Sequence, residues 1–74
     1  MTRPKRTPKV GDRVRETTVS GSKRMHTILT MHATVKYPRP GERYVALIED
    51  GDKHSWTLPL TTLLSADWLE VFEP

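Results

Sequence analysis

The chain has 74 residues, of which 35% are hydrophobic and 28% charged, and this length corresponds to one small domain. It contains no cysteine, which excludes disulfide bonds, cysteine-ligated zinc and a thiol nucleophile. No apolar run approaches the ~20 residues of a membrane-spanning helix, and no hydrophobic stretch of the secretory kind follows the basic start. We therefore expect one soluble, cytoplasmic domain with a small core and a thin margin of stability.

Charge is divided unevenly along the chain, although the formal net charge is only +3. Residues 1–43 hold 11 Lys and Arg against three acids, a net charge of +8, whereas residues 44–74 hold one cation against six acids, a net charge of −5. Residues 1–9 contain four of the cations, two prolines and no acid. This composition predicts a flexible basic arm over residues 1–9, followed by a domain over residues 10–74.

Two strands are predicted in the first half of the domain. The first spans residues 13–19, which are rich in Val and Thr, and a polar loop with a central glycine follows it. Residues 27–37 alternate between apolar and mostly polar side chains, and this period of two predicts a long, half-buried strand. Its buried face is expected to consist of the odd-numbered residues Leu29, Met31, Ala33, Val35 and Tyr37.

A hairpin is predicted after the break at residues 38–41, which read Pro-Arg-Pro-Gly. Its strands span residues 43–49 and 53–58, with a turn at Asp50-Gly51. A two-residue turn would place Trp56 on the same face as Val45, whereas a three-residue loop would pair it with Ala46. Both registers fit the sequence.

The last elements are a helical turn and a fifth strand. Pro59 ends the fourth strand, and Leu60, Leu63 and Leu64 follow with the i, i+3, i+4 spacing of one short helical turn. Residues 68–72 then form the final strand. The expected fold class is mainly β, a five-stranded barrel with one short helical turn before its last strand.

This order of elements resembles the SH3-like small β-barrel of SH3, Tudor and KOW-type modules. Residues 10–14 (Val-Gly-Asp-Arg-Val) are similar to the opening turn of such barrels, and residues 58–63 and 68–71 to their closing helical turn and last strand. The resemblance implies a barrel over residues 10–74. The first loop lacks the aromatic residues with which SH3 domains hold proline-rich peptides, and the chain has few aromatics for a methyl-lysine cage. Small size and Arg- and Thr-rich composition suggest a bacteriophage or bacterial accessory protein.

No catalytic, cofactor or metal site is predicted. The spacing of His26, His32 and His54 matches no zinc signature. No serine lies in a nucleophile elbow, and no glycine-rich phosphate loop occurs. We therefore expect a binding module rather than an enzyme.

The ligand favoured by the charge pattern is nucleic acid, held mainly through its phosphates. The chain contains no Asn and no Gln, the side chains that pair bidentately with adenine, so weak sequence specificity is expected. The predicted contacts are the cations of the arm and loops: Arg3, Lys5, Arg6, Lys9, Lys23, Arg24, Lys36 and Arg39.

The alternative is a protein-interaction module, such as a small phage factor that docks on a host protein. Its contact residues would be Tyr44 and Trp56, and Trp56 is also a candidate base-stacking platform. In either case we expect a monomer or a weak homodimer that contacts no membrane.

Overall fold

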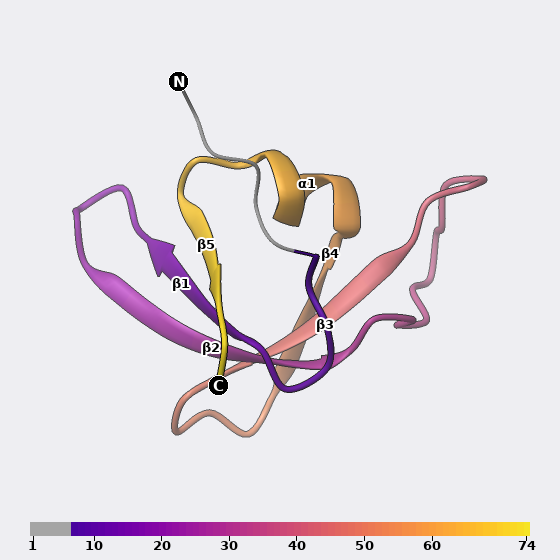
Figure 1. The fold of residues 1–74 in the computed structure, drawn as a ribbon. Coiled ribbons are helices and arrows are strands. Elements are labelled where there is room, and N and C mark those ends of the chain that lie inside the picture. The colour runs from indigo at the N-terminus through magenta and orange to yellow at the C-terminus, as the bar shows by residue number, and fades with distance from the viewer. Residues whose placement is uncertain (1–6) are drawn as a thin grey trace.

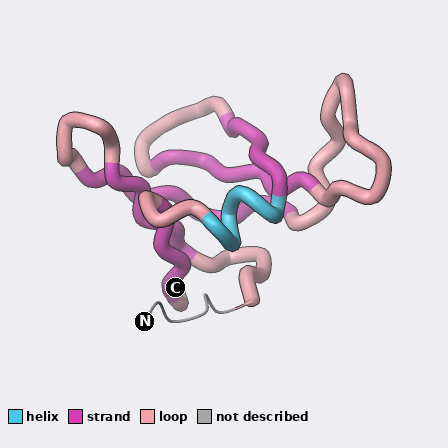
Figure 2. The backbone as a smooth tube through the Cα atoms, turned by 90° about the horizontal axis from the view of Figure 1, so that it is seen from above, coloured by secondary structure: helices cyan, strands magenta, loops and turns pink. Residues whose placement is uncertain are grey.

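A computed structural model describes residues 7–74 as a five-stranded antiparallel sheet with one short helix (Figures 1 and 2). The five strands and the helical turn before the last strand confirm the fold class predicted from the sequence. The elements are β1 (Arg13–Thr17), β2 (Lys23–Thr30), β3 (Tyr44–Glu49), β4 (Ser55–Pro59), α1 (Leu60–Ser65) and β5 (Leu69–Phe72).

The strand order is β4-β3-β2-β1-β5, so four strands form a meander and the last strand returns to lie beside the first. In the described part of the chain β4 and β5 form no ladder with each other, so the sheet is not closed and the predicted barrel is wrong in this respect. The connection between these two edge strands is α1, whose Leu63 is fully buried in the core. A helix side chain, rather than a ladder between β4 and β5, therefore completes the core.

The core draws on every strand and on the helix. Because alternate residues of a strand face opposite sides, each strand contributes side chains from one face to the main core cluster, and Ala46 is buried on the other face of β3. The cluster consists of Val14, Ile28, Val45, Leu47, Leu58, Leu63 and Leu69.

β2 differs from the long strand predicted for residues 27–37. It ends at Thr30, and its buried face holds His26 and Ile28, each 1% exposed, while Leu29 is 46% exposed. The prediction that the odd-numbered residues face inward was therefore wrong for Leu29. The pairing partners decide the face, since His26 lies opposite Val14 and Ile28 opposite Leu47.

The ladder between β2 and β3 shifts register between Ile28 and Thr30, and the chain then leaves the sheet. Met31 still packs against the core, but residues 31–43 form a loop in which Tyr37 is 81% exposed. Alternation continued in the sequence beyond Thr30, but the ladder with β3 ends there, and beyond it the Ala33 N–H donates to the Tyr44 carbonyl at 2.9 Å.

The register of the second hairpin is also settled. Leu47 pairs with Trp56 and Val45 with Leu58, so Trp56 shares a face with Val45 and does not pair with Ala46. Residues 50–54 connect the strands, and this connection is longer than either predicted turn. At the other hairpin, β1 ends at Thr17, so Val19 lies in the turn and not in a strand.

Candidate functional site

The four predicted loop contacts lie at the two ends of β2. Lys23 and Arg24 begin the strand, whereas Lys36 and Arg39 lie in the loop that follows its last residue. An eight-residue strand is about 26 Å long, and Figures 1 and 2 show the hairpin at residues 18–22 and the loop at residues 31–43 on opposite sides of the molecule. The two pairs of cations therefore do not form one surface.

At the first end, the cations are engaged by neighbouring side chains. Lys23 donates a hydrogen bond from Nζ to Thr17 Oγ1 at 2.9 Å, across the hairpin. The Arg24 guanidinium lies 3.8 Å from a carboxylate oxygen of Glu49. Arg24 thus faces a carboxylate, whereas the partner of Lys23 is an uncharged hydroxyl.

The arginines of β1 are paired with acids from the second half of the chain. Arg13 donates two hydrogen bonds to the Asp50 carboxylate, one of them at 2.9 Å, and Arg15 donates one to Glu70 at 2.9 Å. The hydrogen bonds from Arg13, together with its charge, hold the pKa of Asp50 below its ordinary value, and the same contact raises the pKa of Arg13. Both arginines of β1 are thus neutralised by nearby acids.

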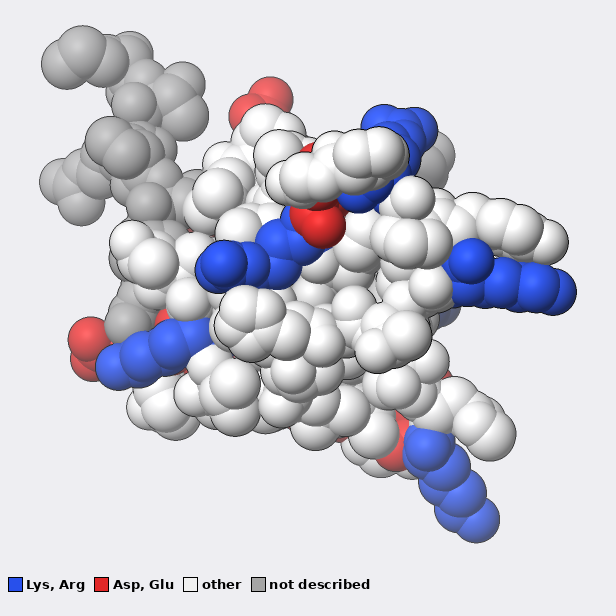
Figure 3. All heavy atoms as spheres, turned by 90° about the vertical axis from the view of Figure 1, so that its right-hand side faces the viewer, with Lys and Arg blue, Asp and Glu red and all other residues white. Residues whose placement is uncertain are grey.

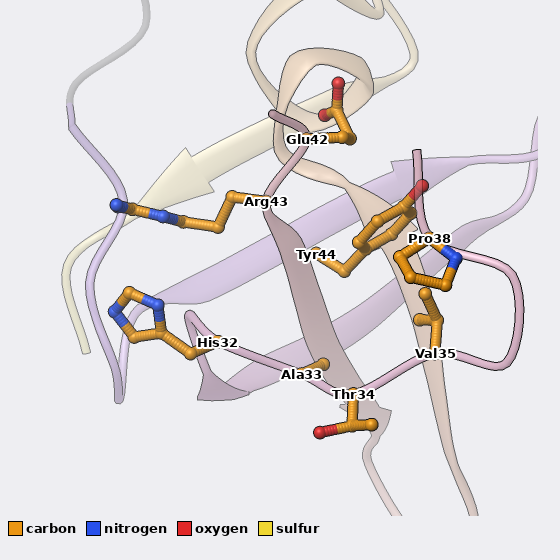
Figure 4. A pocket seen from close by; sticks show the side chains of 8 residues that line it. All are labelled: His32, Ala33, Thr34, Val35, Pro38, Glu42, Arg43 and Tyr44. Carbon is orange, nitrogen blue, oxygen red and sulfur yellow. The ribbon is translucent and has the colours of Figure 1, made fainter. Parts of the chain in front are cut away.

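The loop at residues 31–43 is different, because its cations have no such partners. Lys36, Arg39 and Arg43 form no ion pair with any residue in the range 7–74. Glu42 is the loop's one acid, and its carboxylate accepts a hydrogen bond from Thr61 Oγ1 at 3.1 Å. Figure 4 shows the side chains of Glu42 and Arg43 pointing in different directions.

Tyr44, predicted as a protein contact, holds this loop in place. Its hydroxyl oxygen accepts a hydrogen bond from the backbone N–H of Arg39 at 3.1 Å, and its carbonyl accepts one from Ala33 at 2.9 Å. Gly41 turns the chain back with a φ of 76°, a value that side-chain-bearing residues rarely adopt. The half-buried Tyr44 ring lies beside Pro38 in Figure 4, so it anchors the loop from inside.

Lys9 joins the same side of the molecule. Its N–H donates to Asp12 Oδ2 at 3.1 Å, and its carbonyl accepts from the Asp12 N–H at 3.1 Å. Lys9, His32 and Arg43 line a hollow of about 490 Å³ beside α1, and the last two also line the adjoining 350 Å³ hollow of Figure 4. Of the predicted arm contacts, Arg3, Lys5 and Arg6 lie outside the described residues.

These side chains form one candidate site, which we call the loop surface. Figure 3 looks at this side of the molecule and shows Lys and Arg side chains protruding at several points, with some Asp and Glu atoms beside them. The loop surface consists of Lys9, His32 and Arg43, which line the two hollows, together with the exposed residues Lys36, Tyr37 and Arg39 of the same loop.

Two aromatic residues differ in their exposure. Trp56 is half-buried and packs against the core, with its ring edge-to-face on His26 at a centroid distance of 5.3 Å. Tyr37, which alternation assigned to the core, is the exposed ring of the loop surface. Its position between Lys36 and the Pro38-Arg39-Pro40 segment was the sequence signal for an exposed loop residue.

The histidines do not gather. His32 and His54 are exposed, whereas His26 is buried and its Nε2 lies 2.9 Å from Glu16 Oε1. Across residues 7–74 no three His, Asp or Glu side chains are grouped so that they could hold a metal ion.

No helix in the described range is long and apolar enough to cross a membrane. A comparison of the chain with protein-family models, curated proteins and solved structures found no match.

Proposed function

We propose that the protein is a non-enzymatic module that binds nucleic acid through the loop surface. The observation that carries this proposal is the contrast between two sets of cations. Arg13, Arg15 and Arg24 face carboxylates, whereas Lys36, Arg39 and Arg43 face none that the structure describes. A cation without a carboxylate partner can neutralise a phosphate and release its counterions without first giving up an ion pair.

The recognition we propose is of the backbone, with weak sequence specificity. Contacts to phosphates position a nucleic acid but do not read its bases. The chain has no Asn or Gln for bidentate contacts to adenine, so arginine at guanine is the main remaining route to base reading.

We also infer that the fold is an open relative of the SH3-like small barrel. Its meander, the return of β5 beside β1 and the helical turn before β5 support this inference. A rigid sheet that presents a long loop is a common arrangement for binding proteins.

The test compares two double variants with the same change in net charge. Lys36→Ala with Arg39→Ala removes two cations from the loop surface, and Lys23→Ala with Lys53→Ala removes two from elsewhere. Binding to a labelled single-stranded oligonucleotide is measured by fluorescence anisotropy over a range of salt concentrations. The loop variant is expected to weaken binding and to reduce the slope of log affinity against log salt by about 1.4, since each phosphate contact contributes about 0.7.

The control variant should retain most of the affinity and nearly the full slope. Equal losses in the two variants would mean that only net charge matters, and the loop surface would then not be the site. An affinity that does not depend on salt, or no binding by the unaltered chain, would overturn the proposal altogether.

A protein-contact role is the second candidate function. It is favoured by exposed apolar side chains at the β1–β2 turn, which lies on the side of the molecule opposite the loop surface. Val19 is fully exposed in the β1–β2 turn, and Trp68 is 44% exposed. Together with residues 16–18 they line a hollow of about 580 Å³. In this candidate Val19 and Trp68 replace Tyr44 and Trp56 as contacts.

Capture experiments separate this candidate from the first. A specific partner protein that is retained after nuclease treatment, lost on Val19→Ser and kept on Lys36→Ala would support protein contact at this end. A partner kept by the Val19→Ser variant would exclude this surface.

A further inference from the structure

The chemistry of the loop surface narrows the class of nucleic acid that it would take. We propose that the loop surface binds single strands, and that the Tyr37 ring stacks on an unpaired base. This inference rests on the nucleic-acid binding proposed above.

The first observation is the exposure of Tyr37. Its ring is 81% exposed, although an aromatic side chain gains considerable free energy when it is buried. The Lys36 Nζ lies 5.6 Å from the ring centroid, and Arg39 follows two residues later. If a base stacked on this ring, the phosphates of its nucleotide would lie near Lys36 and Arg39, which flank Tyr37 in the sequence.

The second observation is that the loop is held in shape before any ligand binds. Tyr44 accepts the hydrogen bond from Arg39, and the backbone N–H of Glu42 donates to the Arg39 carbonyl at 3.1 Å. Pro38 and Pro40 further restrict the backbone next to Tyr37. A preorganised loop loses little conformational entropy on binding, so the stacking energy is retained.

An exposed aromatic ring between two cations favours binding of single strands over binding of duplexes. Bases in a duplex are already stacked on their neighbours, so an aromatic ring reaches a base face only after unstacking or flipping it. Every unpaired base offers a free face, and stacking on an aromatic side chain tolerates any sequence. This agrees with the lack of Asn and Gln in the chain.

The experiment measures affinity for single-stranded DNA, single-stranded RNA and duplex DNA of one sequence, by anisotropy at low salt. The unaltered chain is expected to bind at least one single strand more tightly than the duplex. Tyr37→Ala should weaken single-strand binding by about fivefold or more, the loss of one stacked base. Tyr37→Phe, which keeps the ring, should bind as the unaltered chain does.

The outcomes separate this inference from the proposal beneath it. If Tyr37→Ala leaves single-strand affinity unchanged, or if the duplex binds as tightly as the single strands, the stacking inference is wrong while salt-dependent binding still stands. If no oligonucleotide binds, the proposed function fails as well. Circular dichroism of Tyr37→Ala checks the fold, which should not change because the side chain is largely in solvent. The tighter of the two single strands identifies DNA or RNA as the source of the ligand.

Discussion

Ile28 and Leu29 are neighbours on β2, yet they lie in different surroundings. Ile28 is 1% exposed and belongs to the core cluster, while Leu29 is 46% exposed on the other face of the sheet. The two side chains have the same number of carbon atoms, so they form a matched pair for measuring what burial contributes.

We expect Ile28→Ala to lower the free energy of unfolding by about 2–5 kcal/mol, because it removes buried atoms and leaves a cavity. Leu29→Ala should lower it by less than about 1 kcal/mol, since most of that side chain already contacts water. Urea denaturation of the two variants measures both values. If the two variants lost similar amounts of unfolding free energy, Ile28 would not be the buried member of this pair and the observed face of β2 would be wrong.

The contact between Arg13 and Asp50 gives a pH dependence. The pKa of Asp50 is lower in the folded state than in the unfolded chain, where it is about 3.9. The ionised carboxylate therefore stabilises the fold fully above this unfolded-state pKa. That stabilisation is lost as the pH falls through the folded-state pKa. The gap in urea midpoint between the unaltered chain and Asp50→Asn should therefore be constant near neutral pH and shrink below about pH 4. Asp50 is exposed and Arg13 is partly exposed, so solvent screens the contact and the gap is small.

Asp67→Asn serves as the control for this measurement, since Asp67 is exposed and forms no ion pair with the residues that the structure describes. Its gap from the unaltered chain should vary less with pH than that of Asp50→Asn. The same pH profile in both variants would exclude a specific role for the Arg13 contact.

At the scale of elements, the loop at residues 31–43 is held by hydrogen bonds and packing rather than by a strand partner. Tyr44→Phe removes the acceptor of the Arg39 N–H and should lower the free energy of unfolding by about 0.5–1.5 kcal/mol. Amide hydrogen exchange at Arg39, followed by NMR, should become faster. Tyr37→Phe also removes a phenol hydroxyl but leaves this hydrogen bond in place, so exchange at Arg39 should not change.

The helix and strands also show which features a short sequence pattern can predict and which it cannot. Asp50-Gly51 and Pro59 predicted the ends of β3 and β4, and the leucine spacing after Pro59 predicted the helix, because these signals act within a few residues. The break at residues 38–41 did not predict the end of β2, which lies at Thr30. The inward face of β2 depended on Val14 and Leu47, which lie opposite it on two other strands. A shift of one residue exchanges the faces of a strand, and alternation alone fits both arrangements.

At the scale of the whole molecule, the basic and acidic halves of the sequence do not form two halves in space. β1, which carries Arg13 and Arg15, lies between β2 and the acidic β5, and Asp50 reaches it from the β3–β4 connection. Most of the sheet's charge is therefore balanced locally. The loop surface keeps four of the 11 cations of residues 1–43, which are Lys9, Lys36, Arg39 and Arg43.

Removal of residues 1–6 tests the contribution of the remaining cations. The deletion takes away Arg3, Lys5 and Arg6 and lowers the formal net charge from +3 to 0. Long-range attraction to a polyanion should weaken, so the association rate with single-stranded DNA should fall at low salt and the difference should narrow as salt screens the charges. Stopped-flow fluorescence at two salt concentrations measures this. An unchanged rate at low salt would show that the arm does not assist binding.

The sequence by itself determined that this is one small β domain with five strands, a helical turn before the last strand and a basic N-terminal half. Those properties follow from composition and from signals between near neighbours. Only the tertiary structure decided that the sheet stays open, that Tyr37 lies in solvent while Trp56 packs on the core, and which cations meet carboxylates. The reason is that each of these depends on residues brought together by strand pairing across long stretches of chain, such as Arg15 and Glu70.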